Sequence, residues 1–254
     1  MKMLELKNIS VQFGGIKALK NVSFEVQKNS LFSIIGPNGA GKTTLLNVIS
    51  GRYKPKNGSL FFNKKDITSL HPNKRASIGI GRTFQNLALF DHMTVLDNLY
   101  VGRHHLLKSN FFSGSIYWLF GAQKEEIRSR IEAEKILDFL EISNVRKSTA
   151  GTLSYGLRKR VELARAIAVK PSLILLDEPM AGMNLEEKED MARFIIDLNR
   201  EWGITVIMIE HDMGVVMDIS KKIVVLDFGE KIAEGTPEII INNKRVQEAY
   251  LGQD

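Results

Sequence analysis

Eight consecutive residues fit the spacing G-x-x-x-x-G-K-[ST], which is typical of loops that bind nucleotide phosphates. They are Gly36-Pro37-Asn38-Gly39-Ala40-Gly41-Lys42-Thr43. The glycines allow successive backbone N–H groups to turn inward around a polyphosphate. Lys42 can reach the β- and γ-phosphates, and the hydroxyl of Thr43 can ligate Mg²⁺. The sequence therefore predicts that the chain binds a nucleoside triphosphate.

The elements expected on either side of this loop are those that phosphate binding requires. The apolar run Leu31–Ile35 predicts a buried strand before the loop, and residues 44–49 predict a helix after it. The start of that helix adds the positive end of its dipole to the backbone N–H groups. The order strand, loop, helix strengthens the prediction of a phosphate site.

A second pair of residues suits the chemistry of phosphate transfer. Asp177 and Glu178 directly follow the apolar run 173–176, which predicts a buried strand that ends in two acids. Asp177 suits Mg²⁺ coordination opposite Thr43, and Glu178 can polarise a water molecule for attack on the γ-phosphate. We therefore expect hydrolysis of the bound nucleotide as well as binding.

Composition restricts the class of protein. The chain has 254 residues, of which 44% are hydrophobic and 25% charged, and it has no cysteine, so disulfides and thiolate chemistry are excluded. No apolar run approaches the ~18–20 residues needed to cross a bilayer, and the N-terminus lacks the apolar segment of an export signal. We expect a cytoplasmic protein. The net charge of +6 comes from scattered residues, which favours a solvated surface over nucleic-acid binding.

The order of predicted elements indicates the fold class. Short β-type runs occupy the first 30 or so residues and residues 59–62, and residues 94–140 have helical apolar spacing. After Pro171, strands and helices alternate, with strands at 173–176, 204–209 and 223–226 and helices near 186–201 and 213–219. Alternation around a phosphate loop predicts a mostly parallel sheet with helices on both faces.

One further segment resembles a known family. Leu153-Ser154-Tyr155-Gly156-Leu157 is similar to L-S-G-G-Q, the signature of the ATP-binding subunits of ABC transporters. The resemblance implies that Ser154 and Gly156, at the start of a helix, bind the γ-phosphate of ATP held by an opposite subunit. Leu157 stands where the family has glutamine, so side-chain hydrogen bonding there is in question.

Other positions match the same family. Gln85 falls at its Q-loop, which implies contact with the Mg²⁺ site and with a membrane partner, and His211 falls at its switch histidine, which holds the γ-phosphate. Phe13 lies where an aromatic ring stacks on adenine. Asn184 occupies a D-loop position that commonly holds aspartate, so we expect contacts across the dimer to differ there.

The resemblance implies a division of the chain and roles for the residues above. The fold is α/β, a P-loop NTPase core with a mostly parallel sheet, an N-terminal antiparallel β subdomain and an inserted helical subdomain. One domain spans residues 1–254, with the core at about 1–93 and 171–254 and the helical subdomain at about 94–170. The catalytic residues implied are Glu178, His211, Gln85 and Lys42, and the Mg²⁺ ligands are Thr43, Gln85 and Asp177. The residues implied to contact ATP are Phe13, Gly36, Asn38, Gly39, Ala40, Gly41, Lys42, Thr43, Thr44, Ser154 and Gly156.

Within the family, the chain looks most like the longer ATPase of branched-chain amino acid importers. That likeness lies in Arg82-Thr83-Phe84-Gln85-Asn86-Leu87, in the long helical segment after His104, and in the ending 246–252. ATPases of urea and lipopolysaccharide transport are near relatives. The cofactors implied are ATP and Mg²⁺. The partners implied are a second ATPase subunit, two membrane permease subunits and a separate substrate-binding protein, with the chain on the inner face of the cell membrane.

Three alternatives stay open at this point. Asn63-Lys64-Lys65-Asp66 fits N-K-x-D, the guanine-reading motif of GTP-dependent switches, but it precedes the acidic strand, and a polar turn fits it better. A soluble ABC-type ATPase that acts on DNA or ribosomes usually carries two cassettes or a long coiled coil, and the sequence has neither. The aromatic stretch 106–120 either packs on its own helices or docks a membrane partner, and the first is favoured.

Overall fold

The parallel sheet of the computed structural model lies at its centre and carries the phosphate loop on its middle strand. The structure describes residues 1–84, 87–103 and 116–251. Within these residues the six-stranded sheet has the order β10-β9-β3-β8-β7-β6. Every neighbouring pair is parallel except β9 and β10, which confirms the predicted mostly parallel sheet. The strands are β3 (Leu31–Ile35), β6 (Ile80–Arg82), β7 (Leu173–Asp177), β8 (Thr205–Ile209), β9 (Lys222–Asp227) and β10 (Glu230–Gly235).

The register of this sheet brings three strand ends together. Asp177 of β7 pairs with Ile209 of β8, and Ile209 pairs in turn with Ile34 of β3. Because parallel strands run in one direction, the segments that follow β3, β7 and β8 leave the sheet at the same edge. The chain segments beginning at Gly36, Glu178 and Glu210 therefore start side by side.

A second, antiparallel sheet is built from the N-terminal third of the chain, as predicted. Its order is β2-β1-β4-β5. The strands are β1 (Lys2–Phe13), β2 (Ile16–Gln27), β4 (Asn57–Phe62) and β5 (Lys65–Asp66). Asn63 and Lys64, with φ of 48° and 67°, turn the chain between β4 and β5. Two left-handed residues between paired strands are the geometry of a tight hairpin, which confirms the polar turn rather than a guanine-reading loop.

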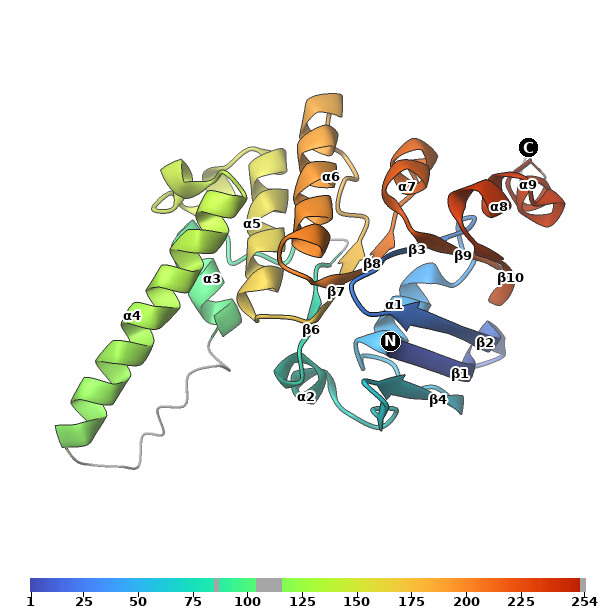
Figure 1. Ribbon diagram of the computed structural model, residues 1–254, viewed down its shortest axis with the longest axis horizontal. Helices are drawn as coiled ribbons and strands as arrows, with labels where there is room; N and C mark the ends of the chain where they lie inside the picture. The colour runs from blue at the N-terminus through green and yellow to red at the C-terminus, as the bar shows by residue number, and fades with distance from the viewer. Residues whose placement is uncertain (85–86, 104–115, 252–254) are drawn as a thin grey trace.

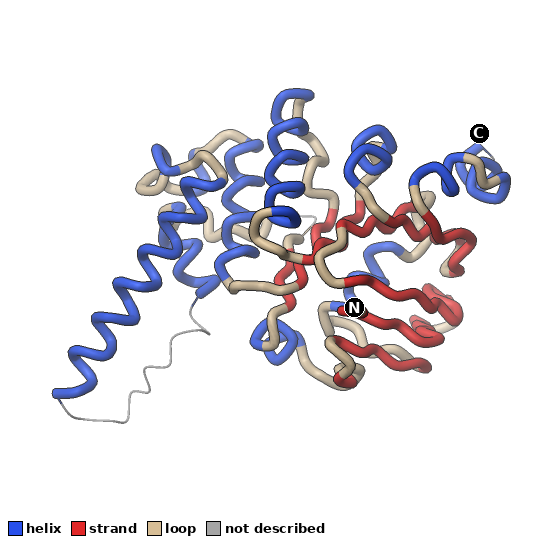
Figure 2. The backbone as a smooth tube through the Cα atoms, viewed as in Figure 1, coloured by secondary structure: helices blue, strands red, loops and turns tan. Residues whose placement is uncertain are grey.

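Helices cover both faces of the parallel sheet (Figure 1). Helix α1 lies between the two sheets, whereas α5, α6 and α7 stand on the opposite face and α3 and α4 extend to one side. Figure 2 shows the same separation, with the strands gathered at one end and the long helices at the other. The helices are α1 (Lys42–Ile49), α2 (Pro72–Ser77), α3 (Val95–Arg103), α4 (Ile116–Phe139), α5 (Tyr155–Ala168), α6 (Leu185–Arg200), α7 (Met213–Ile219), α8 (Pro237–Ile241) and α9 (Lys244–Leu251).

The helical segment expected at 94–140 corresponds to α3 and α4. The division of the chain into a core and a helical subdomain stays a prediction. The aromatic stretch 106–120 lies outside the residues whose side chains the structure describes. Within the described residues, no helix is both long and apolar enough to span a membrane.

Successive residues of the parallel strands enter two different cores. Ile34, Leu175 and Ile207 belong to the core shared with α1 and the antiparallel sheet. Their neighbours Leu176 and Met208 belong to the core beneath α3 to α7. Strands buried on both faces are expected to be continuously apolar, and this is why β3, β7 and β8 were readable as short apolar runs.

The C-terminal end of α1 is held by a buried arginine. Arg75 of α2 is 1% exposed. Its Nη1 donates to the carbonyl oxygens of Val48 and Ile49 at 2.6 and 2.8 Å, and Nε and Nη2 donate to those of Leu70 and Thr68 at 2.9 and 3.1 Å. A cation at this end also complements the negative pole of the helix dipole. Burial lowers the pKa of Arg75 to about 10, so the side chain is still charged at neutral pH.

Replacing Arg75 by alanine removes all of these donors and leaves buried carbonyl oxygens without them. Since a hydrogen bond from a charged donor contributes about 1.5–3 kcal/mol, we expect the free energy of unfolding to fall by about 3 kcal/mol or more. Urea denaturation measures the change. Lys74→Ala, at the exposed neighbouring position, is the control and should cost about 0.5 kcal/mol or less. Equal stability of the two variants would contradict the capping role.

Candidate functional site

The loop between β3 and α1 forms one wall of an open cavity of about 490 Å³. Predicted phosphate-loop residues line it, and so do Glu178 and His211 from the ends of β7 and β8. The remaining wall comes from β2 and from the turn between β9 and β10. The lining residues from the predicted nucleotide set are Asn38, Gly39, Ala40, Gly41, Lys42, Thr43 and Thr44. The structure thus brings the predicted loop and three of the four predicted catalytic residues, Lys42, Glu178 and His211, to one cavity.

Gly36, the first glycine of the loop, has no room for a side chain. Gly36 has a φ of 147°, and a Cβ at this position would lie 2.0 Å from the carbonyl oxygen of Leu226 in β9. The loop therefore starts in close contact with the neighbouring strand. Lys42 folds back over the loop, and its Nζ donates to the carbonyl oxygens of Gly36 and Pro37 at 2.7 and 2.9 Å.

The electrostatics of Lys42 suit an anionic ligand. The side chain is buried, which lowers its pKa, while the charges of Glu178 and Asp177 act in the opposite direction. A γ-phosphate placed beside Nζ adds further negative charge and favours the protonated lysine. The loop supplies backbone N–H groups and the start of α1 at the same place, so the cavity is chemically fitted to a polyphosphate.

The residues expected to hold Mg²⁺ fit that ion. Asp177 is 1% exposed, and its Oδ2 accepts a hydrogen bond from Nη2 of Arg82 at 3.0 Å. Its Oδ1 is buried and has no hydrogen-bond partner among the described residues. Burial raises the pKa of Asp177, and the Arg82 guanidinium opposes that shift. Thr43 offers a hydroxyl from the first turn of α1. One carboxylate, one hydroxyl and the phosphates of a nucleotide are ligands typical of protein-bound Mg²⁺.

In the part of the chain that the structure describes, no group of three or more His, Asp or Glu side chains is placed to hold a metal ion. Gln85 lies outside the described residues. Its contact with Mg²⁺ stays a prediction.

Glu178 and His211 both line the cavity, and their side chains are in direct contact. Nε2 of His211 lies 3.0 Å from Oε1 of Glu178. The backbone of Glu178 is left-handed, with φ of 52°, and its N–H donates to the carbonyl of Ile209 at 2.9 Å. A non-glycine residue held in this conformation carries strain of about 1–3 kcal/mol, and such strain clusters at functional sites. The geometry is suitable for a carboxylate that positions a water molecule.

Glu210 supports this pair and was missed in the sequence. It is buried, and its carboxylate accepts hydrogen bonds from the backbone N–H groups of Met180 and His211 at 2.7 and 3.1 Å. Burial raises its pKa. These bonds join the segments that follow β7 and β8. Its position directly before His211 was the only sequence signal of this role.

The signature residues lie apart from the phosphate cavity of their own chain. Ser154 caps α5 and accepts from the N–H of Leu157 at 3.4 Å, and neither Ser154 nor Gly156 lines the described cavity. A Cβ on Gly156 would lie 2.1 Å from Oε1 of Glu187, so the signature turn contacts the start of α6. The side chain of Leu157 packs against the core beneath α5, which explains why an apolar residue is accommodated there.

Asn184 has a structural role in the chain itself. Its Oδ1 accepts from the N–H of Glu187 at 2.9 Å, and Oε2 of Glu187 accepts from the N–H of Asn184 at 3.1 Å. These reciprocal bonds form a capping box at the start of α6. Asparagine is among the preferred residues at such a position, so the departure from aspartate preserves the cap.

Two aromatic residues lie near the cavity. Phe13, expected to stack on adenine, is 46% exposed and meets the ring of Tyr53 edge-on at 5.1 Å, but it is not among the residues that line the cavity. Phe228 does line it, is 75% exposed, and has a left-handed backbone with φ of 41°. Phe228 could not be predicted from the sequence, because an isolated aromatic residue at a strand end belongs to no recognisable motif.

Similarity to known proteins agrees with this site. A family model described as ABC transporter matches residues 19–181, and one described as Branched-chain amino acid ATP-binding cassette transporter matches residues 230–254. A high-affinity branched-chain amino acid transport ATP-binding protein of Pseudomonas aeruginosa is 39% identical over 251 residues, which are 99% of this chain and 98% of that protein.

Solved structures show the same fold. The ADP conformation of an ATP-binding cassette of an ABC transporter is 35% identical with a TM-score of 0.85 and full coverage of both chains. A dimeric cassette in a post-hydrolysis state, bound to ADP and Pi, is 30% identical with a TM-score of 0.78 over 92% of this chain and 99% of that one.

Replacing Lys42 by alanine tests the phosphate loop. Because a charged hydrogen bond to phosphate contributes about 1.5–3 kcal/mol, we expect the affinity for ATP to fall by about 10–100-fold. Equilibrium titration with a fluorescent ATP analogue measures the affinity. Lys54→Ala, at an exposed position outside the cavity, is the matched control and should leave the affinity unchanged. Unaltered ATP affinity in Lys42→Ala would count against the assigned role.

Proposed function

This chain belongs to the ABC transporter family of ATP-binding proteins, and we propose that its ATPase activity drives the import of branched-chain amino acids across a membrane. The observation that carries the proposal is the full-length similarity to a branched-chain amino acid transport ATP-binding protein. It is joined by a cavity in which the phosphate loop, Glu178 and His211 meet. The match of residues 230–254 supports the same choice of cargo.

We propose the following roles for residues at the cavity. The backbone N–H groups of the loop and Nζ of Lys42 hold the β- and γ-phosphates. Thr43, Asp177 and Gln85 hold Mg²⁺, which when bound neutralises charge on the phosphates. Glu178 accepts hydrogen bonding from the attacking water and polarises it. His211, 3.0 Å from Glu178, contacts the γ-phosphate and fixes the orientation of that carboxylate.

We propose that two ATPase subunits form the active unit. Ser154 and Gly156 do not line the cavity of their own chain, so their proposed contact with γ-phosphate requires a second subunit. The similar cassette bound to ADP and Pi is dimeric. In a two-chain arrangement each phosphate loop faces the signature of its partner, ATP binding closes the pair, and hydrolysis lets it reopen.

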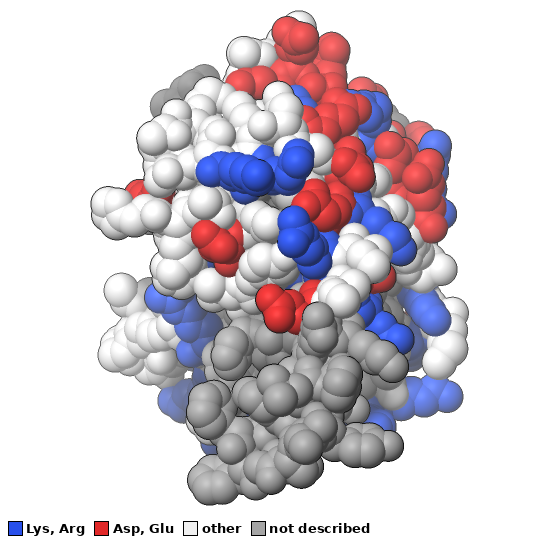
Figure 3. Space-filling model, turned by 90° about the vertical axis from the view of Figure 1, so that its left-hand side faces the viewer, with Lys and Arg blue, Asp and Glu red and all other residues white. Residues whose placement is uncertain are grey.

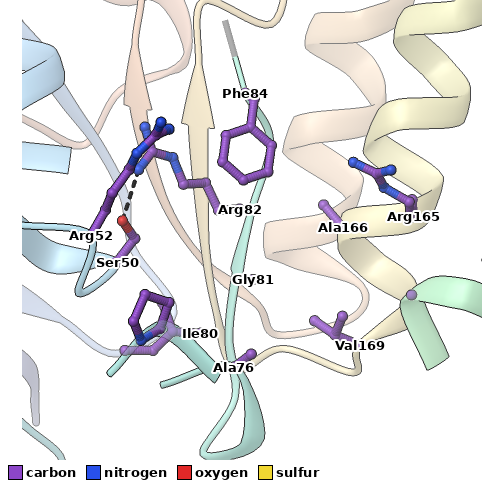
Figure 4. A pocket seen from close by; sticks show the side chains of 12 residues that line it. Ser50, Arg52, Ala76, Ile80, Gly81, Arg82, Phe84, Arg165, Ala166 and Val169 are labelled. Carbon is purple, nitrogen blue, oxygen red and sulfur yellow. Dashed lines mark hydrogen bonds between the residues drawn. The ribbon is translucent and has the colours of Figure 1, made fainter. Parts of the chain in front are cut away.

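We assign to the membrane permease a groove of about 450 Å³ that is lined by Arg82 and Phe84, which shortly precede Gln85 in the sequence (Figure 4). Phe84 faces Arg165 and Ala166 of α5 across it, whereas the side chain of Arg82 points away from α5 toward Ser50 and Arg52. The lining is largely apolar with a few cations, which suits a helix end from a partner. Two permease subunits and a separate substrate-binding protein complete the proposed importer, with this chain on the inner face of the membrane.

The charges on one face of the molecule favour a protein partner over nucleic acid there. Figure 3 shows acidic and basic side chains interleaved on the side where α4 lies in Figure 1. Arg160 and Arg193 form ion pairs with Asp190 and Glu141. Dispersed and paired charges do not make the basic stripe that binding to a phosphate backbone requires.

Phe13 and Phe228 are two candidates for stacking on the adenine base of ATP, and alanine variants distinguish between them. If Phe13 stacks on adenine, Phe13→Ala should weaken ATP binding by about 5–150-fold, because stacking of a base contributes about 1–3 kcal/mol. Phe228→Ala should then have little effect. Titration of ATP against each variant decides between them, and a loss confined to Phe228→Ala would move the base site to the turn between β9 and β10.

Replacing Glu178 by glutamine tests catalysis. We expect ATP binding to persist, hydrolysis to slow by about 10²–10⁴-fold because the general base is lost, and the ATP-bound dimer to accumulate. Phosphate release and light scattering measure the two effects. Glu186→Gln, an exposed acid in the first turn of α6, is the control. Normal turnover in Glu178→Gln would overturn the assignment of the base.

Uptake of labelled leucine, isoleucine and valine tests the cargo. Cells that lack this protein should lose uptake, wild-type protein should restore it, and Glu178→Gln should not. Unchanged uptake on deletion would overturn the cargo, and urea, other amino acids and lipopolysaccharide would be the transport substrates to test next.

A further inference from the structure

Arg82, at the end of β6, joins two elements of the proposed metal site. Its guanidinium is a fork, and each branch points to a different element. Nη2 donates to Oδ2 of Asp177 at 3.0 Å, at the end of β7. Nη1 donates to Oδ1 of Asn47 and to Oγ of Ser50, both at 2.7 Å, at the end of α1. Figure 4 shows the bond to Ser50 as a dashed line.

The residues to which Arg82 donates on α1, Asn47 and Ser50, follow Thr43 toward the C-terminal end of the helix. Asn47 is four residues after Thr43 and Ser50 seven after it, a spacing that places all three on one side of the helix. A fixed Asn47 therefore fixes the rotation and depth of the helix that presents the Thr43 hydroxyl. The other branch fixes the carboxylate of Asp177 and leaves its Oδ1 without a partner among the described residues.

The hydrogen bonds through which Arg82 joins β7 to α1 are buried, and neighbouring side chains pack on them or bind the same strand end. The side chains of Arg82 and Asp177 are 9% and 1% exposed, and Asn47 is buried as well. The ring of Phe84 covers the guanidinium at 5.2 Å. Thr83 binds the same strand end, because its Oγ1 accepts from the N–H of Asp177 at 3.2 Å. A buried fork that reaches three acceptors on two elements is held in one conformation.

We propose that Arg82 is a positioning residue that sets the spacing between Thr43 and Asp177 and thereby the affinity of the nucleotide complex for Mg²⁺. The inference rests on the proposed magnesium site. Residues that hold the ligands of a metal typically change its affinity by about 10–100-fold when they are replaced. Arg82 lies in the wall of the groove assigned to the permease, and it is not among the residues that line the cavity assigned to ATP.

The lysine variant separates positioning from simple electrostatics. The positive charge of Arg82 repels Mg²⁺, but it also stabilises the charged carboxylate of Asp177, so removing the charge acts on metal binding in two opposite directions. Lysine keeps the charge but cannot reach both elements with one planar group. Weaker metal binding in Arg82→Lys therefore reports the loss of the fork, which releases both the carboxylate and the helix.

The test measures metal binding without turnover. Wild-type protein and the variants Arg82→Gln, Arg82→Lys and Asn47→Ala are loaded with ADP, with protein in excess, and titrated with Mn²⁺ while the spectrum of free Mn²⁺ is followed by electron paramagnetic resonance. ADP affinity in EDTA and the melting temperature are measured in parallel. Arg52→Gln removes a cation from the same groove without touching Asp177, so it is the matched control.

We expect Arg82→Gln to weaken Mn²⁺ binding by about 10–100-fold, with unchanged ADP affinity in EDTA. Arg82→Lys and Asn47→Ala should weaken it in the same direction, and Arg52→Gln should match the wild type. Equal or tighter Mn²⁺ binding in Arg82→Gln, or wild-type binding in Arg82→Lys, would overturn the proposal. If Arg82→Gln does not fold, Arg82→Lys and Asn47→Ala decide. Failure of the ADP-loaded wild-type protein to bind Mn²⁺ would instead overturn the metal site itself.

Discussion

The parallel pairing of β3, β7 and β8 is the constraint on which the site depends. Their register places Ile35, Asp177 and Ile209 at one edge of the sheet, so the loop, the acids and the histidine leave it together. A shift of one residue in this register would turn Asp177 toward the opposite face of the sheet. The geometry of the candidate site therefore begins with hydrogen bonds between strands rather than with contacts between the side chains that line it.

Burial on both faces is what fixes that register. Each of these strands contributes alternate residues to a core with α1 and to a core with the long helices, so a slipped strand would disturb both cores. Against this rigid frame the site holds unfavourable local features, including the left-handed Glu178 and the buried Lys42 and Asp177. Packing elsewhere in the two cores offsets their cost.

Much of this arrangement could be predicted from the sequence, because it follows patterns. β3 was expected with its observed bounds, as was α7, and the turn at Asn63 follows from its polar residues. Arg75, Arg82 and Glu210 could not be found in that way. Each acts through contacts with elements distant in the chain, and a charged residue in so short a segment carries no period that marks it as buried or paired. The roles of the predicted site residues were inferred from motifs and stay predictions.

The contact between Gly156 and Glu187 limits how this chain can change over evolutionary time. The signature turn lies against the carboxylate that caps α6, and Tyr155 lies against Gly182 in the same way, 3.1 Å from where its Cβ would be. A larger residue at Gly156 requires a smaller or differently directed side chain at position 187, and one at Gly182 is strained in addition by its φ of 77°. The contacting positions are 31 and 27 residues apart in the sequence, so we expect a change on one side of either contact to be tolerated best together with a change on the other.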